Sequence, residues 1–399
     1  MNSWEQRFTE KFIRYAKIST ASDPQTSNKC PSTQCQFDLA KLLEQELKQL
    51  GLRTELTDKC ILYSYYNEQN TKSRIVLSAH VDVSPDAPSV NVNPQIVQFQ
   101  GKDVVLQHNT IPLDNMPNIN IGDYLITTDG STLLGGDDKA GIAAIMLVLE
   151  ELINNKITDI PSICVCFTPD EEIGLKGAQN VDVQKLIGPA ESYFGLTLDG
   201  MRTRQLNFDT FNAVSFNLQL DGFNTHPGYA YNTMINSILS ISNFVNTVSQ
   251  KLIKPEDSQL EQGYVLFNKI NAEVLHSSTS GILRSFSAAE MAHFKSFMEE
   301  TAKSVFKTKY SLQFSDTYQN LNPYLDITIQ ERLTKIGEKY NANVVKFRGG
   351  TDGSFLSSKG VATPNVWSGT GNFHSVLEFV VVKEAVEAAM FVLDVIKSE

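Results

Sequence analysis

Three consecutive acids, Asp170, Glu171 and Glu172, follow the apolar run SICVCFT in the segment FTPDEEIG. Adjacent carboxylates repel one another, so a fold that gathers them needs a positive counter-charge, which a divalent cation can supply. In α/β proteins, ligands bind beside the carboxyl ends of the strands, and acids placed directly after an apolar run fit such a site. A solvated turn is the alternative interpretation of these three residues alone.

A histidine and an aspartate share the end of another apolar run, RIVLSAHVD. His80 and Asp82 point to the same side of an extended chain, because side chains repeat every two residues. A carboxylate in this position can orient a metal-bound imidazole and raise its basicity. A core histidine beside a surface acid is the alternative at this position.

Further acids and a second histidine lie in three more segments. LLGGDDKAG places Asp137 and Asp138 at the start of an apolar helical segment, where helix capping explains at least one acid. Asp199 ends the run YFGLTLDG, and His374 lies among glycines and small polar residues in GNFHSVLEF.

Together these segments supply nitrogen and carboxylate donors and no thiolate, the mixture that suits catalytic zinc or a similar divalent ion. One ion would leave too many ligands, whereas two ions about 3.5 to 4 Å apart, bridged by a carboxylate and a water, would use all five. Of two adjacent loop residues such as Glu171 and Glu172, one can bind metal while the other takes the proton of the bridging water. The five candidate ligands are His80, Asp137, Glu172, Asp199 and His374.

Alternating helical and strand-like segments must position these side chains. Apolar residues recur at helical spacing in 4–17, 39–50 and 140–153, and RIVLSAH, SICVCFT and YFGLTLD are typical of strands covered on both faces. The alternation predicts an α/β fold whose mixed, mostly parallel sheet is sandwiched by helices. The segment from Ser84 to Asn120 is predicted to be loop and hairpin, because it is rich in Pro and Asn.

After about residue 210 the pattern becomes that of an α+β region with an antiparallel sheet and two helices. NAVSFNLQLDG alternates like a half-exposed strand, a helix is expected over 233–248, and Ser287 and Glu290 have capping-box spacing at the start of a second helix. A chain of 399 residues exceeds the size of one hydrophobic core, so two domains are expected. We expect a larger domain at 1–209 and 320–399, interrupted by a smaller inserted domain at 210–319.

Composition excludes several classes of partner. A net charge of −11 argues against nucleic acid and anionic membranes, because nothing offsets phosphate repulsion. The N-terminus lacks the pattern of a signal peptide, and the longest apolar stretch, AGIAAIMLVL, is too short to span a bilayer. The 5 cysteines suit reduced thiols, so a cytoplasmic location is expected.

The motifs, in this order, resemble those of the co-catalytic zinc exopeptidase family that includes carboxypeptidase G, aminoacylase and peptidase T, and the peptidase T group is the most similar. The resemblance implies a zinc-exopeptidase-like fold and an aminopeptidase that acts on short peptides, which are tripeptides in the peptidase T group. It also implies two Zn²⁺ per subunit, with Co²⁺ or Mn²⁺ as alternative ions. The motifs are VNPQIVQF, LITTDGSTLLGGDDKAG, FTPDEEIGLKGA, NTHPG, RGGTDG and HSVLEF.

The resemblance also implies a role for each ligand. His80 and Asp199 would hold one zinc, Glu172 and His374 the other, and Asp137 would bridge both.

The same resemblance implies the groups around the metals. Glu171 would be the general base, Asp82 would steady His80, and a cis peptide would join Asp137 to Asp138. The inserted domain would serve as a lid or for dimerisation.

Other residues of these motifs have both a binding and a purely structural interpretation. The resemblance implies that His226 of NTHPG stabilises the oxyanion, in its own site or in that of a partner subunit, although His-Pro-Gly is also a turn. Arg284 would pair with a peptide carboxylate, or is an exposed strand residue. Arg348 and Asp352 of RGGTDG lie where the backbone approaches a ligand closely, or in a tight turn.

The chain departs from the peptidase T pattern at Met201, Ser285 and Ser287, none of which is a candidate ligand. These departures affect the expected tripeptide preference more than hydrolysis. A dipeptidase or an N-acyl amino acid deacylase with the same metal centre is therefore the alternative function, followed by a metal-binding or peptide-binding protein without catalysis.

Overall fold

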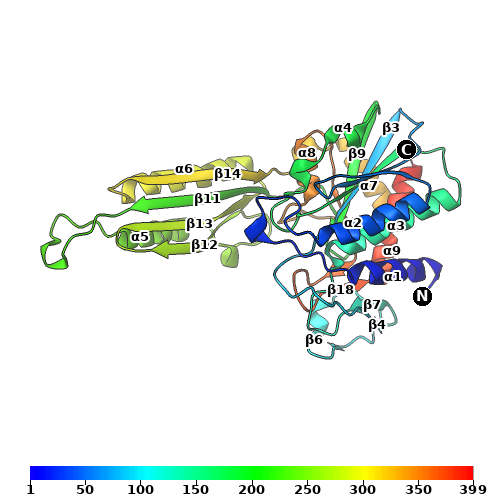
Figure 1. Cartoon of the computed structure of the whole chain (residues 1–399), viewed down its shortest axis with the longest axis horizontal. Coiled ribbons are helices and arrows are strands. Elements are labelled where there is room, and N and C mark those ends of the chain that lie inside the picture. Colours follow the sequence, from blue (N-terminus) through cyan, green and yellow to red (C-terminus); the bar gives the residue numbers. More distant parts are fainter. Residues whose placement is uncertain (399) are drawn as a thin grey trace. The chain divides into compact units, whose positions relative to one another are not determined.

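The computed structural model describes residues 1–398, which form two compact units (Figure 1). Unit 1 comprises 1–208, 321–345 and 351–398, and unit 2 comprises Asp209–Asn320 and Lys346–Gly350. The second segment of unit 2 falls in a range that the sequence analysis placed in the larger domain. It belongs to unit 2 because its backbone pairs with the start of that unit: the Phe347 N–H donates to the Asp209 carbonyl at 2.8 Å.

An eight-stranded mixed sheet forms the centre of unit 1. The four strands β8, β3, β9 and β16 pair in parallel, whereas β1–β2, β2–β8 and β16–β10 are antiparallel, as the mixed, mostly parallel prediction requires. In spatial order the strands are β1 (Arg53–Leu56), β2 (Leu62–Tyr66), β8 (Ser162–Thr168), β3 (Ser73–His80), β9 (Ser192–Gly200), β16 (Asn365–Trp367), β10 (Gln205–Asn207) and β15 (Asn343–Val344).

Helices cover both faces of this sheet, because successive strand side chains point to opposite sides. Ile75 and Leu77 of β3 join the core under the first helical layer, whereas Val76 and Cys164 join a second core under the other. The first layer contains α1 (Ser3–Ala16), α2 (Gln36–Gln49), α3 (Gly136–Asn154) and α9 (Val382–Lys397), with α7 (Ile327–Glu338) packed on α9; the second contains α4 (Val183–Ile187) and α8 (Asp352–Ser358).

The region between β3 and α3 contains short strands and a hairpin, as its Pro and Asn content predicts. Strands β5 (Val104–Val105) and β6 (Thr110–Ile111) form an antiparallel hairpin. Two other strands of this region, β4 (Gln95–Gln98) and β7 (Tyr124–Thr127), join two strands from near the C-terminus in a second, four-stranded sheet. Its order is β17 (Thr370–Gly371), β18 (Phe379–Val381), β7 and β4.

Unit 2 is an antiparallel sheet with helices on one face. Phe216 and Leu218 of the sheet pack against Phe244 and Met298 of the two helices. The sheet order is β12 (Tyr264–Ala272), β13 (His276–Ser285), β11 (Asn212–Asp221) and β14 (Tyr310–Tyr318), and the helices are α5 (Ser237–Lys251) and α6 (Ala288–Val305).

The starts of the two helices of unit 2 follow from their caps. Helix α5 begins later than the expected residue 233, because the Asn236 side chain accepts the Ile238 N–H. Ser287 caps α6 by accepting the Glu290 N–H, whereas the Glu290 carboxylate accepts the Ser285 hydroxyl, so only half of the expected capping box forms. Across residues 1–398, no helix combines the length and apolarity needed to cross a membrane.

Candidate metal centre

The candidate ligands gather at one edge of the sheet of unit 1. His80 ends β3 and lies in register with Thr168, the last residue of the parallel strand β8, so the acidic loop that follows begins beside it. Asp199 lies near the end of β9, which also runs parallel to β3. Asp137 begins α3 on the adjoining helical layer, and His374 lies in the connection between β17 and β18.

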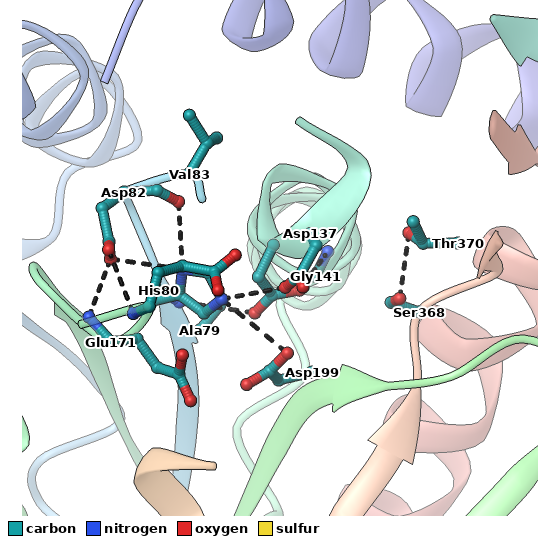
Figure 2. A network of polar contacts seen from close by, with 12 residues as sticks. Ala79, His80, Asp82, Val83, Asp137, Gly141, Glu171, Asp199, Ser368 and Thr370 are labelled. Atoms are coloured by element: carbon teal, nitrogen blue, oxygen red, sulfur yellow. Dashed lines mark hydrogen bonds and ion pairs between the residues drawn. The ribbon is translucent and has the colours of Figure 1, made fainter. Parts of the chain in front are cut away.

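The five candidate ligands form two groups that share Asp137. In the first group, His80 Nε2 lies 2.9 Å from Asp137 Oδ1 and 3.8 Å from Asp199 Oδ1 (Figure 2). In the second, His374 Nε2 lies 3.5 Å from Asp137 Oδ2 and 2.9 Å from Glu172 Oε2. The ligand atoms of each group lie within 4.8 Å of one another. Asp137 offers Oδ1 to the first group and Oδ2 to the second.

Asp82 holds both His80 and the acidic loop. Its buried carboxylate accepts the Glu171 N–H at 3.0 Å and the Glu172 N–H at 3.2 Å, and Oδ1 lies 3.3 Å from His80 Nδ1 (Figure 2). His80 Nδ1 also lies 3.0 Å from the Asp82 main-chain carbonyl oxygen, with which it forms a hydrogen bond, and this leaves Nε2 for the shared site.

The first of the three adjacent acids anchors the loop and does not join the ligands. The buried Asp170 carboxylate accepts the Ser32 N–H at 2.6 Å, the Ser32 hydroxyl at 2.5 Å and the Gln36 amide at 2.6 Å. Asp170 thereby ties the loop to the start of α2, and Glu171 and Glu172 follow with their N–H groups on Asp82. The Asp170 and Glu172 carboxylates therefore face different partners, Ser32 and Gln36 for the first and His374 for the second.

Asp137 and Asp138 have different roles: one is a candidate metal ligand and the other caps the helix. The peptide bond between them is cis, as the family resemblance implied. Asp138 caps the helix by accepting the Gly141 N–H at 3.2 Å, and its other oxygen accepts the His80 N–H at 3.3 Å. Asp137 is therefore left to face the two histidines.

Two supporting carboxylates were not predicted from the sequence. Asp86 Oδ2 lies 3.0 Å from His374 Nδ1, the ring nitrogen that does not face Glu172. The buried Glu378 carboxylate accepts the Leu134, Gly135 and Asp137 N–H groups. The position of Glu378, four residues after His374 in HSVLEF, was the available signal.

The electrostatics of the candidate site favour the binding of a cation. Burial and the nearby Asp137 carboxylate raise the pKa of Glu172 to about 8 and that of Asp199 to about 7. Hydrogen bonding to Asp137 and Glu172 raises the pKa of His374 to about 11. Among residues 1–398, Glu172 Oε1 is buried and has no hydrogen-bond partner, which suits an oxygen that binds a metal ion. The donor set and this unpaired oxygen both fit divalent ions.

Without metal, the protein is expected to lose stability as the pH rises from about 5 to 8. Glu172, Asp199 and His374 all have raised pKa values, so the folded state holds more protons than the unfolded state in this range. Their stabilisation is greatest below the unfolded-state pKa values and is lost as the pH rises through the folded values. The melting temperature of chelator-stripped protein measures this, with metal-loaded protein as the control. A melting temperature that rises over the same range would contradict the expectation.

Four further residues were predicted to belong to the site, and they lie in different units of the structure. Asp352 begins α8 in unit 1, where its buried carboxylate accepts the Thr168 hydroxyl beside the acidic loop. Burial raises the pKa of Asp352 to about 6. The other three belong to unit 2.

Each of those three has local partners within unit 2. His226 forms the predicted turn, with its Nδ1 accepting the Gly228 N–H at 3.2 Å. The Arg284 guanidinium lies 4.9 Å from the centre of the Tyr318 ring. Arg348 donates to the Leu260 carbonyl at 2.7 Å.

Comparison with known proteins identifies the class. The family model described as Peptidase family M20/M25/M40 matches residues 133–398, and the chain belongs to that family. The predicted membership of this peptidase family, the predicted enzyme class and the predicted fold are thereby confirmed.

Within this family, the chain is similar over nearly its whole length to proteins named Peptidase T. The chain is 36% identical to Peptidase T of Clostridium perfringens over 404 residues, covering 97% of this chain and 98% of that protein. Peptidase T of Geobacillus thermodenitrificans is 35% identical, with 98% of each chain covered. The solved aminopeptidase PepT from Bacillus cereus has the same fold, with a TM-score of 0.76, 18% identity and 98% of each chain covered.

Proposed function

We propose that this protein is a metal-dependent aminopeptidase that removes the N-terminal residue from tripeptides. The observation that carries the proposal is Asp137, which offers one carboxylate oxygen to each of two imidazole–carboxylate groups. Such sharing suits two ions that flank one water. The resemblance of the motifs to those of the peptidase T group implies the tripeptide substrate, and the similarity to Peptidase T over nearly the whole chain supports that resemblance.

We propose two Zn²⁺ as the cofactor. His80 and Asp199 would hold one ion, Glu172 and His374 the other, with Asp137 between them. Imidazole and carboxylate ligands without thiolate suit zinc in a catalytic site. When bound, such a pair lowers the pKa of its water from 15.7 to about 7 and polarises a carbonyl oxygen.

Glu171 is proposed to move the proton. Its N–H is fixed on Asp82, while its carboxylate extends toward the side where Asp199 lies (Figure 2). Burial, together with the Asp199 charge, raises the pKa of Glu171, which favours a group that takes a proton from water and then passes it to the leaving amine. Asp82 contributes by holding His80 and the backbone of Glu171 in place.

Residues of unit 2 are proposed to serve the substrate. His226 would stabilise the oxyanion, in its own or a neighbouring subunit's site, Arg284 would bind the peptide carboxylate, and unit 2 would be the lid or the dimer contact. Arg348 and Asp352 are proposed to line the substrate site.

His226→Ala is expected to lower kcat by about 10²-fold or more and to leave metal content unchanged, because an oxyanion donor acts on the reaction and not on the metals. Steady-state kinetics and metal analysis measure both quantities. His276→Ala, an exposed histidine of the same unit, is the control. Unchanged kcat in the His226 variant would contradict the proposed oxyanion role.

The proposed dimer contact through unit 2 is tested by analytical ultracentrifugation of the whole chain, which measures whether it forms a homodimer.

A substrate panel separates the proposed function from its alternatives. Tripeptides are expected to give kcat/KM values at least about tenfold above those of dipeptides and N-acetyl amino acids of matched sequence. The shorter substrates cannot place the scissile carbonyl at the metal centre and the carboxylate at the proposed partner Arg284 at once, which leaves a polar group unpaired. Release of the N-terminal residue is measured by chromatography. Higher values for dipeptides or N-acetyl amino acids would favour the dipeptidase or deacylase alternative, and no release from any of the three classes would favour a non-catalytic binding protein.

We also propose that the protein works in a reducing compartment, the cytoplasm. All five cysteines are free thiols, and Cys60, Cys164 and Cys166 are buried. Buried free thiols are typical of proteins that keep their cysteines reduced. Secretion of the mature chain through an oxidising compartment in its native host would contradict this location.

A further inference from the structure

Glu378 lies immediately before β18 and is 2% exposed. One carboxylate oxygen accepts the Leu134 N–H at 2.9 Å and the Gly135 N–H at 2.7 Å, and the other accepts the Asp137 N–H at 3.0 Å. A buried carboxylate requires such partners, because burial of an unpaired charge is costly. All three donors lie in the loop that delivers Asp137, so the bonds of Glu378 concentrate on a single segment.

Close packing leaves this loop little room to adjust. Gly135 has φ +78°, and a Cβ there would lie 3.1 Å from Val83 Cγ1. A Cβ on Gly136 would lie 2.7 Å from Thr370 Cγ2 and 2.9 Å from Val380 Cγ2. The backbone before Asp137 is thus enclosed by neighbouring side chains and pinned by Glu378, and both constraints act on the residue that the two ligand groups share.

Glu378 also belongs to the segment that supplies a ligand to the second group. Its N–H donates to the Ser375 carbonyl at 3.1 Å, which closes the turn after His374. One short turn therefore carries His374 at its start and the anchor of Asp137 at its end. Because His374 Nε2 lies 3.5 Å from Asp137 Oδ2, a shift of this turn would change both positions.

We propose that Glu378 is a positioning residue that holds the backbone of Asp137 so that its two carboxylate oxygens face the two metal sites. This inference rests on the proposed metal centre, and it assigns no contact between Glu378 and metal or substrate. Residues that orient ligands in this way typically change metal affinity by about 10- to 100-fold when replaced.

The test is a titration of chelator-stripped Glu378→Gln with Zn²⁺ by calorimetry. The amide keeps the shape of the side chain but presents an N–H₂ group where one oxygen accepts, so at least one loop N–H loses its partner. Both dissociation constants are expected to rise by about 10- to 100-fold, with a changed visible spectrum after Co²⁺ loading. A folded Glu378→Gln protein with both constants within about twofold of the parent would overturn the proposal.

Glu384→Gln is the matched control, because Glu384 is equally buried and accepts from Arg202 and from the Thr203 N–H outside the site. It is expected to lower the melting temperature and to leave both dissociation constants unchanged, so it separates loss of stability from loss of positioning. Should Glu378→Gln fail to fold, Glu378→Asp is titrated against Glu384→Asp, and equal affinities in this pair would overturn the proposal. A parent chain that binds no divalent ion would instead overturn the proposed metal centre.

Discussion

Glu171→Gln is expected to lower kcat by about 10²- to 10⁴-fold, the range in which a positioned proton acceptor contributes to catalysis. The amide has nearly the same shape as the carboxylate but cannot accept the proton of the attacking water. KM is expected to change little, because the replaced group acts on the reaction rather than on the bound substrate.

The metals and the fold are expected to survive this substitution. Asp82 holds the loop through the backbone N–H groups of Glu171 and Glu172, and neither bond involves the Glu171 side chain. Glu171 also lies outside both ligand groups. Metal content and melting temperature should therefore match those of the parent protein.

Steady-state kinetics on a tripeptide, with metal analysis of the same sample, measure both quantities. Glu191→Gln neutralises an exposed carboxylate at the start of the segment that leads to β9 and should leave kcat unchanged. Near-parental turnover by Glu171→Gln would assign the proton transfer to another group. Loss of metal together with turnover would make Glu171 a ligand.

Asp137→Asn is expected to weaken the binding of both metal ions by at least about 100-fold and to abolish measurable turnover at stoichiometric metal, since loss of a direct ligand should exceed the usual effect of a supporting residue. Asp137 Oδ1 faces His80 and Oδ2 faces His374. The amide has one oxygen acceptor, and its N–H₂ group would face a cation.

Zinc titration of the chelator-stripped variant measures this effect at each site. Asp159→Asn, an exposed aspartate before β8, controls for the change of charge. Loss of only one ion would show that Asp137 is a terminal ligand of that ion and not a bridge. If the variant binds zinc at both sites as tightly as the parent protein does, Asp137 is not a metal ligand.

The gathering of the candidate ligands could largely be predicted from residue type and position relative to apolar runs. His80, Glu172 and Asp199 each follow a run typical of a buried strand, and parallel strands bring their carboxyl ends to one edge. The segment boundaries of helices were less predictable. Helix α5 begins at Ser237 because Asn236 caps it, and the spacing of apolar residues does not show where the helix starts.

Supporting residues could not be found in this way, because their partners are distant in sequence. Asp170 binds Ser32 and Gln36, more than 130 residues earlier, and Glu378 binds backbone groups 241 to 244 residues away. The backbone N–H groups that Glu378 accepts carry no sequence signal, and the Ser32 and Gln36 side chains meet Asp170 only after folding. The position of Glu378 shortly after His374 was the one hint of either network in the sequence. The different roles of Asp170, which anchors the acidic loop, and Glu172, which faces His374, could not be predicted because their partners are also distant in sequence.

The amino-acid sequence by itself determined the chemistry of this protein: the donor types, their order along alternating strands and helices, and the ordered motifs that place the chain in its peptidase family. Tertiary structure alone decided which acid faces a histidine and which anchors a loop, as in Asp137 against Asp138. The physical reason is that a carboxylate takes its role from the donors that surround it, and those donors meet only when distant segments fold together.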